Sequence, residues 1–173
     1  VLYGGFMATL INLLAGDEAI HYALQHSKAN IGIVGENEME LFLRVRPQQI
    51  KLLPKKTSIS KIKLYANKAS DDALLMYTSG TTGQPKGVVH SHASLLAGGW
   101  TPTLSHNLTP QDRGLCVLPI YHINGLCVTI MGTLISGGSL AVAEKFSVSK
   151  FWKQCQESKV TWLSVVPTII SHL

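Results

Sequence analysis

The sequence predicts an α/β fold with mostly parallel β-sheets flanked by helices. Apolar stretches of strand length alternate with longer amphipathic stretches, and a loop rich in serine, threonine and glycine directly follows one of the apolar stretches. The composition, with 46% hydrophobic and 14% charged residues, is typical of a globular protein. At 173 residues the chain is long enough for one ordinary domain with its own core.

The first half of the chain is expected to alternate between helices and strands. Asp17 or Glu18 can cap the first helix, and Pro47 ends the second. The expected elements, in order, are a helix over 17–27, a short buried strand over 31–34, a helix over 36–45, a polar surface connection over 48–60 and a strand over 62–65.

The second half continues this alternation. The pair Gly137-Gly138 predicts a turn, Ser147 can cap the helix that follows, and Pro167 leads into the last helix. The expected elements are a strand over 73–77, a loop over 78–87, a helix from 91 or 92 to about 104, a strand over 115–118, a buried helix over 122–135, a strand over 139–142, a helix over 147–158, a strand over 161–165 and a final helix.

The charge of the chain argues against a nucleic-acid partner. The formal net charge is +5, and the basic residues are scattered. The densest basic stretch, residues 51–63, has no aromatic residue between its lysines, which is typical of a solvated loop. Binding of a small anionic molecule fits the same charge equally well.

The cysteines indicate the cellular compartment of the protein, and the ends of the sequence indicate whether it is a fragment. Cys116, Cys127 and Cys155 lack the CxxC spacing, so we expect neither a disulfide framework nor a zinc site, and a reducing, cytoplasmic location. No signal peptide is visible, and the sequence starts and stops abruptly in apolar segments. We therefore interpret residues 1–173 as an internal fragment of a longer protein.

One long uncharged stretch needs to be tested as a membrane span. No Asp, Glu, Lys or Arg occurs from Gly114 to Ala143, which is longer than the roughly 20 residues that cross a bilayer. Pro119, His122 and several glycines interrupt this stretch, and its longest nearly apolar part, residues 126–135, has the length of a buried helix. We therefore expect a protein core and no transmembrane span.

The Ser/Thr/Gly-rich loop carries the strongest chemical signal. Its hydroxyls can donate hydrogen bonds to phosphate oxygens, its glycines let the main chain approach an anion, and its lysine adds a positive charge. It is not the common P-loop, because Pro85 stands where that pattern needs glycine and Gly87 follows the lysine in place of Ser or Thr. A flexible surface turn is the alternative, which the density of hydroxyls after a buried strand disfavours. The residues assigned to phosphate binding are Thr78, Ser79, Gly80, Thr81, Thr82, Gly83 and Lys86.

The motif Tyr77-Thr-Ser-Gly-Thr-Thr-Gly-Gln-Pro-Lys-Gly-Val88 closely resembles the AMP-binding signature of the adenylate-forming superfamily. This superfamily includes acyl-CoA synthetases, coumarate-CoA ligases and peptide-synthetase adenylation domains. The resemblance extends over most of the chain, including Asn12 and residues 118–125 and 161–168. It implies that the chain is part of the large N-terminal domain of an adenylate-forming enzyme, most like an acyl-CoA ligase.

The resemblance implies a two-step reaction. A carboxylate, which we expect to belong to a fatty or related acyl acid, attacks the α-phosphorus of ATP and gives an acyl-adenylate and pyrophosphate. The thiol of coenzyme A then displaces AMP. The loop would hold the β- and γ-phosphates, and Mg²⁺ would lie on these phosphates near Thr81 or Thr82, with Thr82 as the assigned contact.

The resemblance also assigns roles outside the loop. His122 matches a position at the access to the active site and is expected to position or gate the substrate, although a lone histidine is more often structural. Asn124, Gly125 and Val128 are expected in the acyl pocket, with core packing as the alternative. Lys145 matches a position that can contact coenzyme A, and a solvent-facing lysine before a helix is equally consistent.

Several motifs of the superfamily are not found in this sequence. They are the aromatic-Gly-Thr-Glu motif, the ribose-binding Asp and the C-terminal domain with its catalytic lysine, so we expect the fragment alone to be inactive. Two other functions stay open. One is an amino-acid adenylation domain that loads a carrier-protein thiol, although residues 124–135 contain no carboxylate for an α-amine. The other is a non-catalytic nucleotide-binding module.

Overall fold

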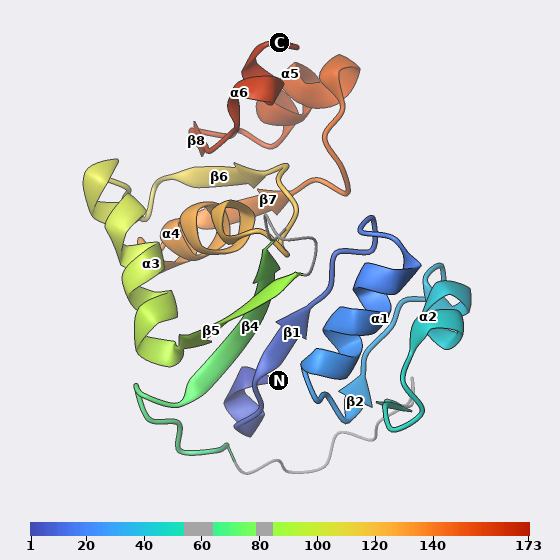
Figure 1. Ribbon diagram of the computed structural model, residues 1–173. Helices are drawn as coiled ribbons and strands as arrows, with labels where there is room; N and C mark the ends of the chain where they lie inside the picture. Colours follow the sequence, from blue (N-terminus) through green and yellow to red (C-terminus); the bar gives the residue numbers. More distant parts are fainter. Residues whose placement is uncertain (54–63, 79–84) are drawn as a thin grey trace. The chain divides into compact units, whose positions relative to one another are not determined.

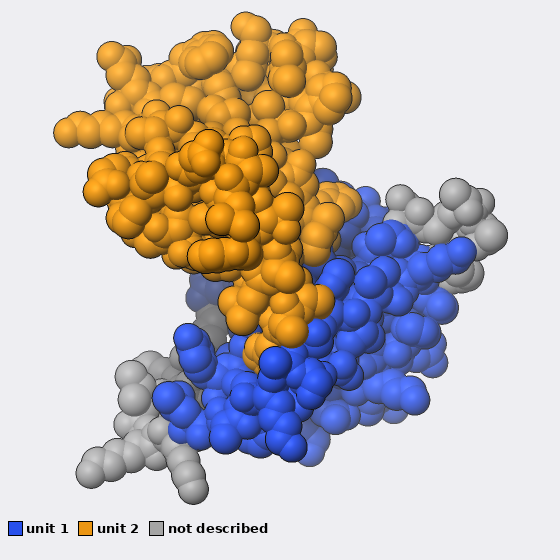
Figure 2. All heavy atoms as spheres, turned by 90° about the vertical axis from the view of Figure 1, so that its left-hand side faces the viewer, with its two compact units in different colours: residues 1–91 blue, residues 92–173 orange. Residues whose placement is uncertain are grey.

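The computed structural model describes residues 1–53, 64–78 and 85–173. The chain divides into two compact units, Val1–Ser91 and His92–Leu173 (Figure 2). Helices and strands alternate in both units, and most strand pairs are parallel. The predicted α/β class with mostly parallel sheets is therefore confirmed.

The first unit contains a three-stranded mixed sheet in the order β1-β4-β5 (Figure 1). A short 3₁₀ turn, η1 (Leu2–Gly4), precedes β1 (Ala8–Leu10), which runs parallel to β4 (Asp72–Thr78). The next strand, β5 (Lys86–Ser91), runs antiparallel to β4. The central strand β4 was predicted, whereas β1 and β5 were not.

Two helices of the first unit, α1 (Asp17–His26) and α2 (Met39–Val45), share a hydrophobic core. Helix α1 contributes buried apolar side chains to this core, and α2 contributes others from its own inner face. The buried members of the cluster are Ile20, Leu24, Phe42, Val45 and Ile50.

The cap predicted at Asp17 or Glu18 is wrong, because the observed cap lies one residue before Asp17. Gly16 is the N-cap, with a φ of 86° that an L-residue rarely adopts. Asp17 lies in the first turn, where its carboxylate accepts hydrogen bonds from Nε of Arg44 at 2.7 Å and from Nη2 at 3.1 Å. These bonds hold the pKa of Asp17 below its usual value.

A separate parallel pair joins β2 (Ile31–Gly32) to β3 (Lys51–Leu52). The prediction of a buried strand over 31–34 is wrong in length and burial, because the ladder is two residues long and Ile31 is 52% exposed. Strand β3 lies within the stretch 48–60, which was predicted as a surface connection. The strand was missed because two residues are too few to show an alternation of apolar and polar side chains. The predicted strand over 62–65 is not observed at 64–65, and residues 62–63 lie outside the described residues.

The second unit contains a parallel sheet in the order β7-β6-β8 (Figure 1). The strands are β6 (Arg113–Cys116), β7 (Ser139–Val142) and β8 (Trp162–Leu163). Strand β6 begins two residues before the predicted 115–118, because Arg113 and Gly114 pair with β7. Helices α5 (Val148–Glu157) and α6 (Pro167–Ile170) contribute Phe151 and Ile169 to a core with Leu115 and Val117.

Helix α3 (His92–Ser105) packs against a helical segment whose first part is a π-helix and whose last part is an α-helix. The predicted helix over 122–135 is a π-helix, η2 (Asn124–Met131), followed by an α-helix, α4 (Gly132–Ile135). The Thr129 hydroxyl donates to the main-chain oxygen of Asn124 at 3.1 Å, five residues earlier, which fits the wider winding. Within the described part of the chain, no helix has both the length and the apolar character needed to cross a bilayer.

Two adjacent glycines on α3 give a matched test of this packing. A Cβ at Gly99 would lie 2.7 Å from Cβ of Met131 and 2.6 Å from Cδ1 of Ile135, whereas a Cβ at Gly98 would meet nothing closer than 3.5 Å. We expect Gly99→Ala to lower the free energy of unfolding by about 1–3 kcal/mol through overpacking. We expect Gly98→Ala to raise it by up to about 1 kcal/mol, because alanine is the better helix former. Urea unfolding measures both, and equal effects would contradict the close approach at Gly99.

Candidate active site

Two of the predicted phosphate-binding residues lie opposite each other in the first unit. Thr78 is the last residue of β4, Lys86 is the first residue of β5, and the two are paired in the antiparallel register. Thr78 Oγ1 lies 3.5 Å from the main-chain oxygen of Lys86. The sheet therefore brings together the two described ends of the predicted loop. The other assigned loop residues lie outside the described residues: Ser79, Gly80, Thr81, Thr82 and Gly83.

The chemistry of these two ends suits an anion. Both side chains are exposed, one a hydroxyl and one an ammonium group. Within residues 1–53, 64–78 and 85–173, no carboxylate forms an ion pair with Lys86. A donor pair of this kind fits phosphate oxygens. Across the same ranges, no group of three His, Cys, Asp or Glu residues is arranged to hold a metal ion. The residue assigned to Mg²⁺, Thr82, is not among those described.

Strand β4, which carries Thr78, is held against α1 by hydrogen bonds that the sequence analysis did not predict. The Tyr77 hydroxyl lies 2.9 Å from Nδ1 of His26 and 3.1 Å from the main-chain oxygen of Ala23, both on α1. Burial raises the pKa of Tyr77, and the neighbouring Tyr22 raises it further, so the phenol stays neutral. No sequence pattern links His26 to the loop, because 51 residues separate it from Tyr77.

The predicted positioning residue His122 lies in the second unit, just before η2. Its backbone N–H donates to the main-chain oxygen of Pro119 at 3.1 Å, which closes a turn after β6. Its ring is exposed and lies 4.8 Å, centroid to centroid, from the ring of Tyr121. This side chain is thus available to a ligand.

The predicted acyl-pocket residues all belong to η2. Asn124 Oδ1 accepts a hydrogen bond of 2.8 Å from the Ser164 hydroxyl, which ties the start of η2 to the segment after β8. Gly125 is buried, and a Cβ there would lie 2.4 Å from the main-chain oxygen of Pro119, so close packing requires this glycine. Val128 is half-buried. π-helical segments occur frequently at functional sites.

The second unit also contains Lys145, the predicted coenzyme A contact, and the cysteines. Lys145 is exposed in the connection between β7 and α5. Burial raises the pKa of the Cys116 and Cys127 thiols, so both stay protonated near neutral pH and are poor nucleophiles. Thr78 and Lys86 are therefore together in the first unit, and His122, Asn124, Gly125, Val128 and Lys145 belong to the second.

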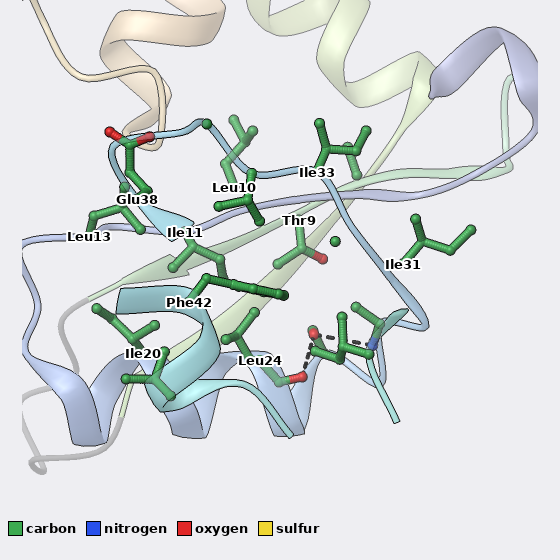
Figure 3. Close-up of a pocket in the computed structure, with 18 of the residues that line it drawn as sticks. Thr9, Leu10, Ile11, Leu13, Ile20, Leu24, Ile31, Ile33, Glu38 and Phe42 are labelled. Carbon is green, nitrogen blue, oxygen red and sulfur yellow. Dashed lines mark hydrogen bonds between the residues drawn. The ribbon is translucent and has the colours of Figure 1, made fainter. Parts of the chain in front are cut away.

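A pocket of about 490 Å³ lies in the first unit, and none of the predicted site residues is among those that line it (Figure 3). Apolar side chains from β1, α1, α2 and the segment around β2 line it, among them Leu10, Leu24 and Phe42 (Figure 3). Glu38 is the only charged side chain among the described residues that line it. An apolar wall with one carboxylate does not suit a triphosphate, so we do not assign this pocket to ATP.

Comparison with known proteins decides the family. Residues 1–173 match the profile of the family described as AMP-binding enzyme. This chain belongs to the AMP-binding enzyme family. The resemblance of the motif over 77–88 is thereby confirmed, and the relatives to which the chain is similar include CoA ligases.

Curated relatives and solved structures agree with this family. The chain is 39% identical over 183 aligned positions to sulfoacetate–CoA ligase of Cupriavidus necator, covering 98% of this chain and 36% of that protein. It is 36% identical to oxalate–CoA ligase of Saccharomyces cerevisiae, covering 59% of this chain and 19% of that protein. The chain thus spans about a third or less of the length of these relatives.

A solved member of the AMP-binding family has the same fold. The o-succinylbenzoate CoA synthetase of Bacillus subtilis in complex with ATP and a magnesium ion superposes with a TM-score of 0.82 at 28% identity. The match covers 95% of this chain and 35% of that one. The chain therefore has the fold of part of a CoA synthetase.

The hydrogen bond between Ser164 and Asn124 can be tested by stability. We expect Ser164→Ala to lower the free energy of unfolding by about 0.5–1.5 kcal/mol, because Asn124 loses the donor to its amide oxygen. Ser149→Ala is the matched control: its exposed hydroxyl lies 3.3 Å from the Ser147 hydroxyl, its one hydrogen-bond partner among the residues that the structure describes, and the effect should stay within about 0.5 kcal/mol. Urea unfolding measures both variants. Equal values for the two would show that the Ser164 bond does not hold η2.

Proposed function

We propose that the protein containing this chain activates a carboxylic acid with ATP and transfers the acyl group to coenzyme A. The observation that carries the proposal is the pairing of Thr78 with Lys86 at the ends of the AMP-binding motif. The relatives support it, because those named above are CoA ligases or a CoA synthetase. The same names favour coenzyme A over a carrier-protein thiol as the acceptor.

In the first step, a carboxylate oxygen forms a bond to the α-phosphorus of ATP, and the bond from that phosphorus to the bridging oxygen breaks. Pyrophosphate leaves with the electron pair. We assign to Lys86 the neutralisation of charge on the departing phosphates, and to Thr78 a hydrogen bond to their oxygens. This chemistry depends on positioning and charge neutralisation more than on covalent help from the protein. Mg²⁺, when bound, would further neutralise the phosphates.

In the second step, the sulfur of coenzyme A attacks the acyl carbonyl carbon, and the bond between that carbon and the AMP oxygen breaks. AMP leaves, and the thiol proton is released. His122, exposed just before η2, is assigned to position the carboxylate and the incoming thiol. Lys145, exposed before α5, is assigned to contact coenzyme A. We expect the reaction to take place in the cytoplasm.

The substrate we propose is a fatty or related acyl acid. Asn124, Gly125 and Val128 would form part of its pocket, and the stretch from Gly114 to Ala143 contains no charged residue. Sulfoacetate and oxalate, named in two relatives, carry a second anionic group, which a binding site normally pairs with a cation. The lack of lysine and arginine in this stretch therefore favours an acid with an uncharged chain.

The assignment of Lys86 is tested by mutation in the whole protein. We expect Lys86→Ala to lower kcat/KM for ATP by roughly 100-fold or more, because a charge that stabilises the transition state is lost. Lys51→Ala is the matched control, since Lys51 is an exposed lysine of the first unit on β3. Pyrophosphate release, measured with a panel of fatty acids, sulfoacetate and oxalate, gives both rates. An unchanged rate in Lys86→Ala would contradict the assignment, and turnover of the dianionic acids alone would contradict the proposed substrate.

A further inference from the structure

His26, the last residue of α1, makes a specific contact to the strand that leads into the AMP-binding motif. Its Nδ1 lies 2.9 Å from the Tyr77 hydroxyl, and that hydroxyl lies 3.1 Å from the Ala23 main-chain oxygen. The carbonyl oxygen can only accept, so the single phenolic hydrogen is donated to Ala23. His26 must therefore donate its Nδ1–H to the Tyr77 oxygen. This assignment fixes the direction of both hydrogen bonds.

The same two rings lie near Gly87, the exposed glycine beside Lys86, together with Leu75, whose Cδ1 would be 3.0 Å from a Cβ there. Tyr77 and Gly87 are direct partners across β4 and β5. A Cβ at Gly87 would lie 3.4 Å from Cε1 of Tyr77 and 3.5 Å from Cε1 of His26. An aromatic ring laid over a cross-strand glycine stabilises the strand pair and its register. The contact thus acts on the residues next to Thr78 on one strand and next to Lys86 on the other.

The position of the His26 ring is fixed by the burial of its helix and by a stacked aromatic neighbour. Ile20, Ala23 and Leu24 of α1 are buried, so the helix that carries His26 is anchored in the first unit. The ring of Tyr22 stacks on the ring of His26, with centroids 5.5 Å apart and an angle of 20° between planes. The His26 ring is therefore fixed both by its helix and by a stacked neighbour.

We propose that His26 is a positioning residue for ATP: through Tyr77 and Gly87 it fixes the register that sets Thr78 and Lys86 side by side. The inference rests on the proposed function for the use of these two residues. It adds a residue outside the AMP-binding motif, on α1, to those that determine ATP affinity. His26 itself does not touch the nucleotide in this account.

The test compares three histidine variants of the whole protein. His26→Ala removes the Nδ1 donor. His26→Asn places an amide nitrogen the same number of bonds from the main chain as Nδ1 and can still donate to Tyr77. His21→Ala is the matched control, because His21 lies on the same helix and its Nδ1 bonds the Val45 main-chain oxygen at 2.8 Å, away from β4 and β5. For each variant, KM for ATP, KM for the acid, kcat, the Kd for ATP by calorimetry and the melting temperature are measured.

We expect His26→Ala to raise KM and Kd for ATP about three- to tenfold, the factor that one lost hydrogen bond produces, with KM for the acid unchanged. His26→Asn should recover most of this loss, and His21→Ala should leave both ATP constants at the wild-type value. In a Tyr77→Phe background, His26→Ala should add little, since its partner is already gone.

Two outcomes would overturn the inference: ATP constants unchanged in His26→Ala, or a fall in melting temperature and in all kinetic constants that His26→Asn does not reverse. Failure of the proposed function shows itself differently, because wild-type protein would then release no pyrophosphate with any acid. The Kd for ATP still tests His26 in that case.

Discussion

The antiparallel pairing of β4 with β5 is the constraint on which the candidate site depends. Direct cross-strand partners project from the same face of a sheet, so Thr78 and Lys86 present a hydroxyl and an ammonium group to the same side. The next pair along, Tyr77 and Gly87, projects to the opposite side and contacts α1. A slip of one residue would exchange these faces and separate the two donors.

The burial of β4 holds that register in place. The strand is buried from Ala73 to Met76, half-buried at Tyr77, where the AMP-binding motif begins, and exposed at Thr78. Strand β5 is exposed over most of its length, so it takes its position from β4 rather than from a core of its own. Packing thus fixes one strand, and the second strand, carrying Lys86, follows it. An exposed lysine without a carboxylate partner among the described residues keeps its charge available to an anion.

The sequence predicted the elements whose patterns are long or strongly apolar. β4, α3 and β7 are close to their expected bounds. β4 is buried from Ala73 to Met76, α3 is 14 residues long, and the turn Gly137-Gly138 marks the start of β7. The missed strands β1, β3 and β5 are short or largely exposed, and propensity alone does not distinguish such segments from loops. The π-helical winding of η2 is accompanied by a side-chain hydrogen bond from Thr129 to the main-chain oxygen of Asn124, which apolar periodicity does not predict.

The sequence predicted the motif of the candidate site but not the tertiary contacts that support it. The motif over 77–88 identified the family because its residue types and order are specific, and the comparisons confirm that family. The contact of His26 with Tyr77 had no local signal, because it joins two elements through tertiary structure. The structure adds a packing role for Gly125, because its missing side chain makes room for the main chain of Pro119.

The central claim is that the β4–β5 pair presents Thr78 and Lys86 to the phosphates of ATP. A crystal structure of the whole protein with Mg²⁺ and a non-hydrolysable ATP analogue tests it most directly. We expect Nζ of Lys86 within hydrogen-bonding distance of a β- or γ-phosphate oxygen, about 2.7–3.2 Å, with the Thr78 hydroxyl on the same phosphate group. A triphosphate bound elsewhere, with Lys86 directed to solvent, would contradict it.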